Sequence, residues 1–549
     1  MKINNEATLF KISLAAIIIV YVLFMMLDIM EVDAAQYATI AWEMMKSKSY
    51  LQVYHRGLDY LDKPPLLFWM SSLSFSALGV HNFAYKLPAV LFLLLGLVST
   101  YKFCELWYNT TTAKFSTLIL ATCQAYFLMV NDVRTDGLLT GASIFTIWQI
   151  SVYLKSDKNI NLVWAVVGLA LGMMAKGAIA YIIIISAIGG HLLLTLNWKA
   201  IFNYKWLLGV VGVLILLSPM CYGLYQQFDL HPEKFVYGLQ GPSGLRFYFW
   251  IQSFGRITGE NYWQNDTGFF FFFHTILWDF QPWIFLFIPA LFSAIKAIFT
   301  KTYKESISLF GFVLPFLALS TSHYKLPHYI FVLLPFAAVI TADFLISRKQ
   351  KTMELISKIT IGFYTAYFTL GGLCIFYFFP EKSILLISVW IIGFVLYFLF
   401  FYKLPKNAPQ RLLYPIAWAA ICLGFIMSKS LYPNLLQYQA GAMAGKTYHK
   451  TGAGNPFYLF KEGESFALDY YSQKIVNPAD STKMADYPIG TLLYASAEGK
   501  ARLDQEFGDT YKQEKEFDYF PVTRLSINFL RPEKREKTLE KKYLYRKVK

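Results

Sequence analysis

The chain has 549 residues, of which 56% are hydrophobic, 18% are aromatic and only 15% are charged. Soluble domains carry roughly a quarter charged residues, and the apolar residues here gather in blocks of about 20, the length that crosses a bilayer as a helix. This pattern excludes a soluble protein, a disordered protein and an outer-membrane barrel, whose strands would be short and alternating. The predicted fold class is an all-α polytopic membrane protein.

The formal net charge of +15 is typical of a membrane protein whose cytoplasmic loops are basic, and we expect no nucleic-acid partner. The five cysteines form no CxxC pair and no disulfide framework. The first residues, Met1–Lys11, hold two lysines before a long apolar run without a small-residue cleavage site. They therefore indicate a first membrane helix rather than a removable signal.

Thirteen apolar blocks are predicted to cross the membrane as helices. They lie at residues 8–27, 83–103, 114–131, 136–154, 161–177, 178–195, 206–224, 269–295, 306–321, 327–346, 356–379, 383–402 and 410–428. One set of alternate loops holds sixteen Lys and Arg residues, whereas the short loops of the other set hold Arg134, Lys176, Lys325 and Lys382. Because basic loops stay in the cytoplasm, we expect the N-terminus inside and the C-terminus outside.

Three longer segments then fall on the outer side of the membrane. Residues 28–82 form a first loop with short amphipathic helices, and residues 225–268 form a second loop. Residues 433–549 follow the membrane domain of residues 1–432 and are predicted to fold as a small extracytoplasmic α/β domain. The elements expected in this domain are strands at Phe457–Phe460, Thr491–Ala495 and Val522–Asn528 and a helix at Glu498–Glu506.

The first outer loop contains Asp62-Lys63-Pro64-Pro65 directly before an apolar stretch. Two prolines fix the backbone at a helix start, so they aim the preceding Asp and Lys at a defined place on the membrane surface. A lysine is a point charge suited to a phosphate, and a helix N-terminus adds to the attraction for anions. The spacing predicts an anion site at this helix start.

Two further outer turns carry polar residues between apolar spans: Asn131–Asp136 and Ser322–Tyr329. Ionisable groups at the edge of membrane helices are costly, which makes them functional candidates. The turns could serve one site for an anionic, membrane-held substrate, or they could be three unrelated turns. The residues alone leave both interpretations open.

The motifs Glu31-x-Asp33 with Tyr37, Tyr60-x-Asp62-Lys63-Pro64-Pro65-Leu66 with Trp69, Asp136, and Lys325-Leu326-Pro327-x-Tyr329 resemble those of the GT-C class of membrane glycosyltransferases. The nearest group is the branch that holds the aminoarabinose transferases of lipid A and relatives of the protein O-mannosyltransferases. The resemblance extends over the first ~345 residues, and the predicted spans and outer C-terminal domain also fit a GT-C fold.

This resemblance implies a role for each motif. Asp33 is expected to be the catalytic carboxylate and Asp136 a second carboxylate of the site. The residues expected to bind the phosphate of the donor are Tyr60, Lys63, Lys325 and Tyr329.

A divalent metal ion is a further expectation, held by Asp62 together with Asp266 or His274. Two departures from the family pattern stand out. Family members often have Asp-Glu-x-Arg-Tyr where this chain has Asp33-Ala-Ala-Gln36-Tyr37, and the second loop offers Asn265-Asp266 where a metal-binding histidine is expected.

The function that follows is transfer of a monosaccharide from a polyprenyl-phosphate donor to a lipid A, glycan or protein acceptor at the outer side of the inner membrane. A lipid donor removes the need for a nucleotide-binding domain, and the sequence contains no Walker or GxGxxG loop in a soluble context. The partners expected are that donor, the acceptor and membrane lipids. The alternative is a transporter or flippase of a lipid-linked sugar, and a purely structural membrane scaffold is a third interpretation.

Overall fold

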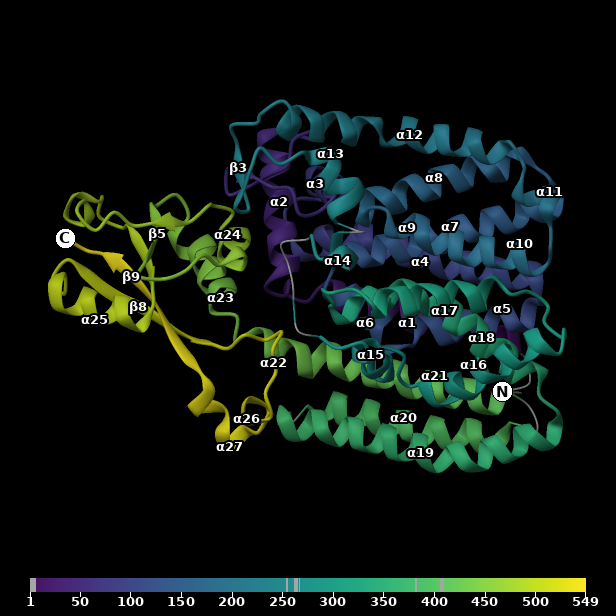
Figure 1. Ribbon diagram of the computed structural model, residues 1–549. Helices are drawn as coiled ribbons and strands as arrows, with labels where there is room; N and C mark the ends of the chain where they lie inside the picture. The colour runs from purple at the N-terminus through teal and green to yellow at the C-terminus, as the bar shows by residue number, and fades with distance from the viewer. Residues whose placement is uncertain (1–5, 253–254, 261–264, 266, 381–382, 405–408) are drawn as a thin grey trace.

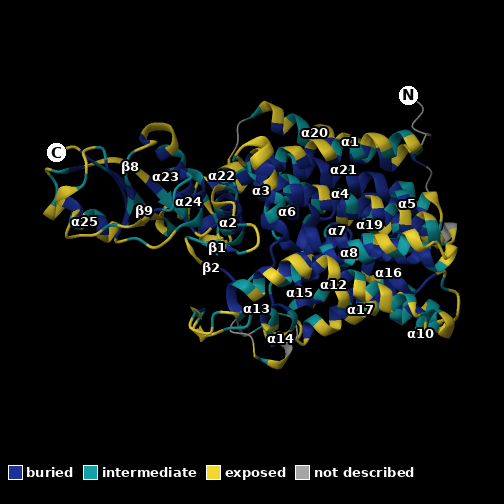
Figure 2. Ribbon diagram, turned by 90° about the horizontal axis from the view of Figure 1, so that it is seen from above, coloured by how far each residue is buried: buried dark blue, intermediate teal, exposed yellow. Residues whose placement is uncertain are grey.

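The computed structural model describes residues 6–252, 255–260, 265, 267–380, 383–404 and 409–549. The long helices run side by side in one bundle, and a small sheet lies at one end of it (Figure 1). The beginning of the first helix lies at the opposite end of the bundle from the sheet (Figures 1 and 2).

Within the described part of the chain, nine helices are long and apolar enough to cross a membrane. They are α1 (Glu6–Met25), α4 (Asn82–Trp107), α7 (Thr135–Ser156), α8 (Asn159–Lys176), the run Trp198–Asp229 that contains α12 (Lys205–Leu224), the run Pro327–Ser347 that ends with α18 (Leu334–Ser347), Thr352–Phe378 within α19 (Gln350–Phe378), α20 (Ile384–Lys403), and the run Gln410–Leu436 that begins with α21 (Gln410–Ile426). Large apolar side chains such as Leu207, Ile215 and Ile384 are exposed, as on helices that contact lipid. Figure 2 shows exposed residues along the outer helices of the bundle. The chain is a polytopic membrane protein, as its composition predicts.

Four of the thirteen predicted blocks differ from a simple span. Block 114–131 is divided into α5 (Thr110–Ala121) and α6 (Gln124–Asn131), which are bent by 56° and together make a tenth candidate. The other three blocks form shorter apolar helices: α9 and α10 within Ile179–Leu194, α15 (Phe271–Asp279) followed by α16 (Ile284–Phe299), and α17 (Ile307–Ser320). The break between α15 and α16 falls at Pro282, which has no N–H to continue the helix. The number of thirteen spans therefore stays a prediction.

Helices α4 and α7 approach closely because glycines lie where they cross. A Cβ built on Gly141 would lie 2.0 Å from the carbonyl oxygen of Phe92, and a Cβ built on Gly96 would lie 3.3 Å from the Cα of Gly141. Small residues at such crossings let helix backbones pack together in a membrane. This contact holds α7, whose first turn carries Asp136, against the rest of the bundle.

The first outer segment forms α2 (Asp33–Ser47), a hairpin of β1 (Tyr54–His55) and β2 (Leu58–Asp59), and α3 (Leu66–Leu78). Helix α3 begins directly after Pro65, as the two prolines predict. The hairpin turns at Arg56 and Gly57, which both have positive φ, the conformation of the tight turns that join such strands.

The second outer segment also contains a two-stranded hairpin. Strands β3 (Phe235–Val236) and β4 (Leu239–Gln240) pair around Tyr237 and Gly238, which also have positive φ. The short helices α13 (Gly244–Arg246) and α14 (Gly255–Thr258) follow. Each hairpin therefore presents one large side chain, Arg56 or Tyr237, at its tip.

The C-terminal part contains a mixed five-stranded sheet in the order β6-β5-β7-β9-β8. Strands β5 and β6, and β5 and β7, are parallel, whereas β9 is antiparallel to β7 and β8. The strands are β5 (Phe457–Phe460), β6 (Asn477–Pro478), β7 (Leu492–Ala495), β8 (Tyr511–Tyr519) and β9 (Glu540–Lys547), and the helices are α22 (Tyr432–Leu436), α23 (Ala440–Thr447), α24 (Phe466–Ser472), α25 (Ala497–Glu506), α26 (Ile527–Leu530) and α27 (Pro532–Arg535).

The predicted elements near 457, 491 and 498 are confirmed as β5, β7 and α25. The prediction of a strand at Val522–Asn528 is wrong, because this stretch turns and enters α26. The side chain of Ser526 accepts a hydrogen bond from the Phe529 N–H, which caps the new helix. The outer strand β8 is missed because its middle, Lys512–Glu516, is polar on both faces.

Candidate functional site

A polar cavity of about 340 Å³ lies at the end of the bundle nearest the sheet. It brings together residues that are far apart in the sequence. Of the predicted site residues, its lining includes Asp33, Tyr60, Asp62, Lys63, Asp136 and Tyr329. The interpretation of one shared site, rather than three unrelated turns, is the one that this geometry supports.

Helix ends deliver several of these side chains to the same place. Asp33 lies in the first turn of α2 and Asp136 in the first turn of α7, where a carboxylate is stabilised by the helix dipole. Lys176 is the last residue of α8, where a cation is favoured for the same reason. The three helices therefore point complementary charges into one cavity.

Lys63 is oriented by its neighbour Asp62. The Lys63 Nζ lies 2.7 Å from Asp62 Oδ2, and Gln252 from the second outer segment donates to Asp62 Oδ1 at 2.8 Å. The two outer segments are thereby joined at the side chain that presents the lysine. Lys63 and Asp62 are both mostly buried, with side-chain exposures of 16% and 20%.

Asp136 lies beside a lysine and a histidine. It forms an ion pair with Lys176, and the Nε2 of His328 lies 3.8 Å from its Oδ2. The ammonium of Lys176 also lies 4.2 Å from the centre of the Tyr329 ring. Asp136 is nearly buried, so it holds Lys176 beside Tyr329 in a fixed position.

Asp33 is the more exposed carboxylate of the cavity. It pairs with Arg134, whose Nε lies 2.8 Å from an oxygen of Asp132. The two carboxylates beside Arg134 raise the pKa of its guanidinium against the opposing effect of burial. Arg134 thus stays charged between a buried partner, Asp132, and the exposed Asp33.

Tyr60 offers a hydroxyl to the cavity. The Tyr60 side chain is 4% exposed, and its buried hydroxyl has no hydrogen-bond partner among the residues that the structure describes. Burial raises the pKa of Tyr60 well above its usual range, and the charge of Asp62 acts in the same direction. The hydroxyl therefore stays protonated and can donate to an oxygen of a bound molecule.

An apolar cavity adjoins the polar one. Its lining includes Leu139, Ile179, Ile182, Pro315, Ala318 and Leu319, and it shares Asp62, Lys63, Lys176 and Tyr329 with the polar cavity. We call this shared edge the charged side of the polar cavity. We call the part lined by Gln36, Tyr60 and Phe466 the aromatic side, since these residues line only the polar cavity.

Lys325 contacts the segment that holds Asn265 and Thr267. Its Nζ donates to the carbonyl oxygen of Thr267 at 2.8 Å, and its side chain is buried. The Lys325 N–H donates to Asn265 Oδ1, and the Lys325 carbonyl oxygen accepts a hydrogen bond from the Asn265 side-chain amide. Lys325 is absent from the described lining residues of either cavity, and its contact with the phosphate stays a prediction.

The metal ion expected at Asp62 stays a prediction. Asp266 lies outside the described residues, and His274 is exposed on α15, away from the linings of both cavities. Lys63 and Gln252 already engage both carboxylate oxygens of Asp62. Nowhere in the described part of the chain do three His, Cys, Asp or Glu side chains gather in a way that could hold a metal ion.

Sequence reasoning missed several residues of the site. Lys176 interrupts an apolar stretch, and an ionisable residue in such a stretch is itself a functional signal. Arg134 and His328 lie in the outer turns Asn131–Asp136 and Ser322–Tyr329, close in sequence to Asp136 and Tyr329. No sequence signal marks Phe466, which comes from the C-terminal part.

Comparisons with known proteins agree with this fold. The dolichyl-phosphate-mannose-protein mannosyltransferase family matches residues 62–222. An uncharacterized protein of Aquifex aeolicus is 26% identical over 447 residues, 80% of this chain and 82% of its own length. An undecaprenyl phosphate-alpha-4-amino-4-deoxy-L-arabinose arabinosyl transferase of Proteus mirabilis is 26% identical over 344 residues, which cover 61% of this chain and 58% of that protein.

A solved structure extends the likeness over the whole fold. ArnT from Cupriavidus metallidurans, bound to undecaprenyl phosphate, superposes with a TM-score of 0.71 over 97% of both chains at 16% sequence identity. The family match, the relatives and this shared fold make the chain similar to membrane glycosyltransferases of the GT-C class. Within that class the chain resembles the aminoarabinose transferases, which confirms the resemblance predicted from the sequence.

Proposed function

We propose that the protein is a membrane glycosyltransferase that moves a monosaccharide from a polyprenyl-phosphate donor to an acceptor on the outer side of the inner membrane. One observation carries this proposal. The charged side of the polar cavity, with Lys63, Lys176 and Tyr329, is also the edge of an apolar cavity. A phosphate joined to a long isoprenoid chain requires both surfaces to meet in this way.

Lys63 and Lys176 are assigned to the phosphate of the donor. The departing lipid phosphate gains negative charge as its bond to the sugar breaks, and fixed cations stabilise that charge most in the transition state. Lys63 is held by Asp62 at 2.7 Å, and Lys176 is held by Asp136. The hydroxyl of Tyr60, which has no hydrogen-bond partner among the described residues, is proposed as a further donor to this phosphate from the adjoining aromatic side.

Asp33 is assigned as the base that takes the proton of the acceptor. An acceptor hydroxyl is a poor nucleophile, so a carboxylate beside it accelerates attack on the anomeric carbon. Asp33 has a side-chain exposure of 36% and lines the polar cavity but not the apolar one. With base and phosphate on opposite sides of the anomeric carbon, the configuration inverts. Asp136 is assigned to holding Lys176 rather than to proton transfer.

Transport of a lipid-linked sugar is the alternative. It predicts ionisable residues near the middle of the bilayer, in broken helices. The carboxylates Asp33 and Asp136 lie instead in first turns of helices, and Lys176 ends α8. This arrangement supports chemistry at the membrane surface over passage through it.

The proposed orientation has the N-terminus in the cytoplasm and the cavity and C-terminal sheet outside, with thirteen membrane crossings. The opposite positions of the sheet and the start of α1 support it (Figure 1). Alkaline phosphatase fused after Tyr438 is expected to be active, whereas a fusion after Lys349 is expected to be inactive. The reverse pattern would overturn the orientation and the position of the site.

The activity is tested directly with purified protein. Radiolabelled undecaprenyl-phosphate sugars are supplied together with a bacterial membrane extract that contains lipid A, glycans and protein. The expected result is label in one acceptor fraction, with inverted configuration at the anomeric carbon. Movement of the labelled lipid across a vesicle bilayer without transfer would support the transporter instead.

A further inference from the structure

The aromatic side of the polar cavity is completed by a residue from the C-terminal part. Phe466, the first residue of α24, lines the cavity together with Asp33, Gln36 and Tyr60. More than 400 residues separate it from these three along the chain. The C-terminal part is therefore not a separate appendage but forms one wall of the site.

The backbone at Phe466 is held by contacts from the first outer segment. Thr39 of α2, which is fully buried, donates to the carbonyl oxygen of Phe466 at 3.1 Å. Ser465 caps α24 and donates to Glu31 Oε1 at 2.6 Å. These two contacts place the beginning of α24 against the beginning of α2, which carries Asp33.

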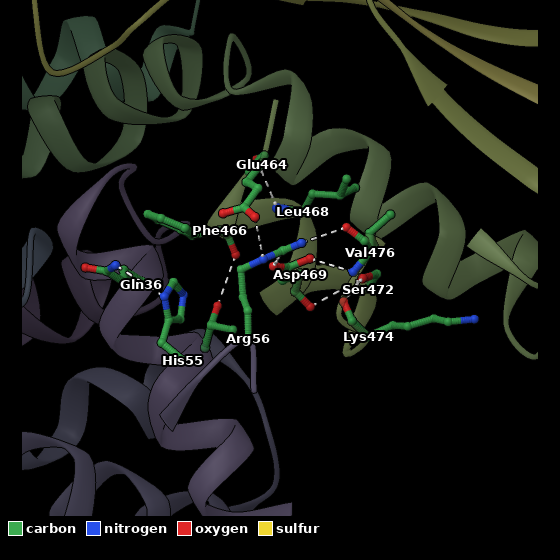
Figure 3. A network of polar contacts seen from close by, with 12 residues as sticks. Gln36, His55, Arg56, Glu464, Phe466, Leu468, Asp469, Ser472, Lys474 and Val476 are labelled. Carbon is green, nitrogen blue, oxygen red and sulfur yellow. Dashed lines mark hydrogen bonds and ion pairs between the residues drawn. The ribbon is translucent and has the colours of Figure 1, made fainter. Parts of the chain in front are cut away.

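Arg56, at the tip of the first hairpin, fixes the same helix from its other side (Figure 3). Its guanidinium pairs with Asp469, donates to the carbonyl oxygen of Val476 at 3.0 Å, and lies 3.2 Å from Glu464. The side chains of Arg56 and Asp469 are 6% and 1% exposed. A buried ion pair with these additional hydrogen bonds sets the position of α24 closely.

The ring of Phe466 packs against the first hairpin and lines the polar cavity. His55, next to Arg56 in the hairpin, lies edge-to-face with it at a centroid distance of 4.7 Å (Figure 3). The Gln36 Nε2 lies 3.4 Å from the Nδ1 of His55, and the ring centroids of Tyr60 and His55 are 6.1 Å apart. The half-buried ring of Phe466 therefore lines the polar cavity together with the amide-bearing side chain of Gln36.

We propose that Phe466 and Gln36 form an acceptor subsite that receives the face of a carbohydrate ring, so that the C-terminal part selects the acceptor. This inference rests on the proposed function. A sugar ring has an apolar C–H face that stacks on an aromatic ring and a polar edge that bonds to amides and hydroxyls. The subsite lies on the aromatic side, away from the edge shared with the apolar cavity, as in-line attack on the anomeric carbon requires.

The test separates acceptor recognition from donor binding. Phe466→Ala is expected to raise the apparent KM for a membrane glycolipid extract about tenfold, as loss of one aromatic stacking contact does. The Kd for undecaprenyl phosphate and the kcat are expected to change less than about twofold. Phe466→Tyr restores the wild-type KM because it keeps the ring, and Phe507→Ala, which removes a ring packed on Tyr511 in the C-terminal part, leaves it unchanged.

A second measurement does not depend on turnover. With 4-fluorophenylalanine at position 466, the fluorine resonance is expected to shift on addition of the glycolipid extract and not on addition of undecaprenyl phosphate. An unchanged KM in Phe466→Ala, or a resonance that responds to undecaprenyl phosphate alone, would overturn the inference. If the wild-type protein transfers no sugar, the proposed function fails, and the fluorine response to the extract still decides whether Phe466 contacts a carbohydrate.

Discussion

The two sides of the polar cavity are built in different ways. The charged side consists of residues from helix ends and tight turns, each fixed by a neighbouring charge or ring: Asp62, Lys63, Lys176 and Tyr329. On the aromatic side, Phe466 is brought in by the C-terminal part and is fixed by contacts between segments far apart in the chain. We therefore expect donor binding to depend on the bundle and its outer loops, whereas acceptor binding should also depend on how the C-terminal part docks.

The largest effect is expected from Asp33→Asn. Without a carboxylate to take the acceptor proton, turnover should fall at least about a thousandfold. The Kd for undecaprenyl phosphate should stay within about threefold of the wild type, because Asp33 does not line the apolar cavity. Full activity in this variant, or retention of configuration in the product, would mean that the base is assigned wrongly.

Lys63→Ala addresses the charged side by itself. We expect the affinity for undecaprenyl phosphate and the turnover to fall together, by about a hundredfold in kcat/KM, since a contact of both ground and transition state is removed. The matched control is Lys325→Met, which removes another outer lysine whose ammonium bonds to the Thr267 carbonyl. Equal losses of affinity for undecaprenyl phosphate in Lys63→Ala and Lys325→Met would contradict the assignment of Lys63.

The charged side could largely be predicted from the sequence, because its signals are local. Pro64 and Pro65 mark a helix start, and Asp136 follows the turn before an apolar span, so their placement needs only secondary structure. The contact between the Lys325 ammonium and the Thr267 carbonyl could not be predicted in this way, because the direction of a side chain in a turn depends on its partner. Lys176 was hidden by the uncertain boundary between two apolar blocks.

The aromatic side could not be predicted in the same way. Phe466 follows Gly463-Glu464-Ser465 in a stretch that contains no motif, and its role comes from the docking of α24 on α2. The sheet was predicted only where strands are apolar, as in β5 and β7, and not where β8 alternates charges. Long-range contacts of this kind carry no period in the sequence.

Arg56→Met is expected to weaken the docking of the C-terminal part. Removing one partner of a buried ion pair leaves Asp469 uncompensated and costs about 3–5 kcal/mol in the free energy of unfolding. Thermal unfolding in detergent should report this loss, and proteolysis near β5 should become faster. Arg56→Met combined with Asp469→Leu should recover part of the stability, whereas a double variant less stable than Arg56→Met would argue against a paired role.

The smallest effect is expected in the pH dependence of stability, because His55 packs against Phe466 where the C-terminal part docks. Burial lowers the pKa of His55 to about 4, and the charge of Arg56 acts in the same direction. The folded protein therefore keeps the ring neutral, whereas the unfolded chain takes up a proton below pH 6.5, the ordinary value. The contribution of His55 to stability is complete above pH 6.5 and is lost as the pH falls toward 4.

Asp469 acts in the opposite direction. Burial raises the pKa of its carboxyl to about 7, against the hydrogen bonds from Val476 and Arg56, so its contribution to stability rises as the pH falls from 7 toward 4. The melting temperature of the wild type therefore contains the pH dependence of both His55 and Asp469. Comparing the wild type with His55→Gln isolates the histidine.

We expect His55→Gln to lose less stability than the wild type between pH 7.5 and 5, values chosen about the ordinary histidine pKa. His231→Gln, which alters a histidine of the second outer segment with an exposed side chain, should follow the wild type. Parallel wild-type and His55→Gln curves would show that protonation of His55 does not oppose the docking of Phe466.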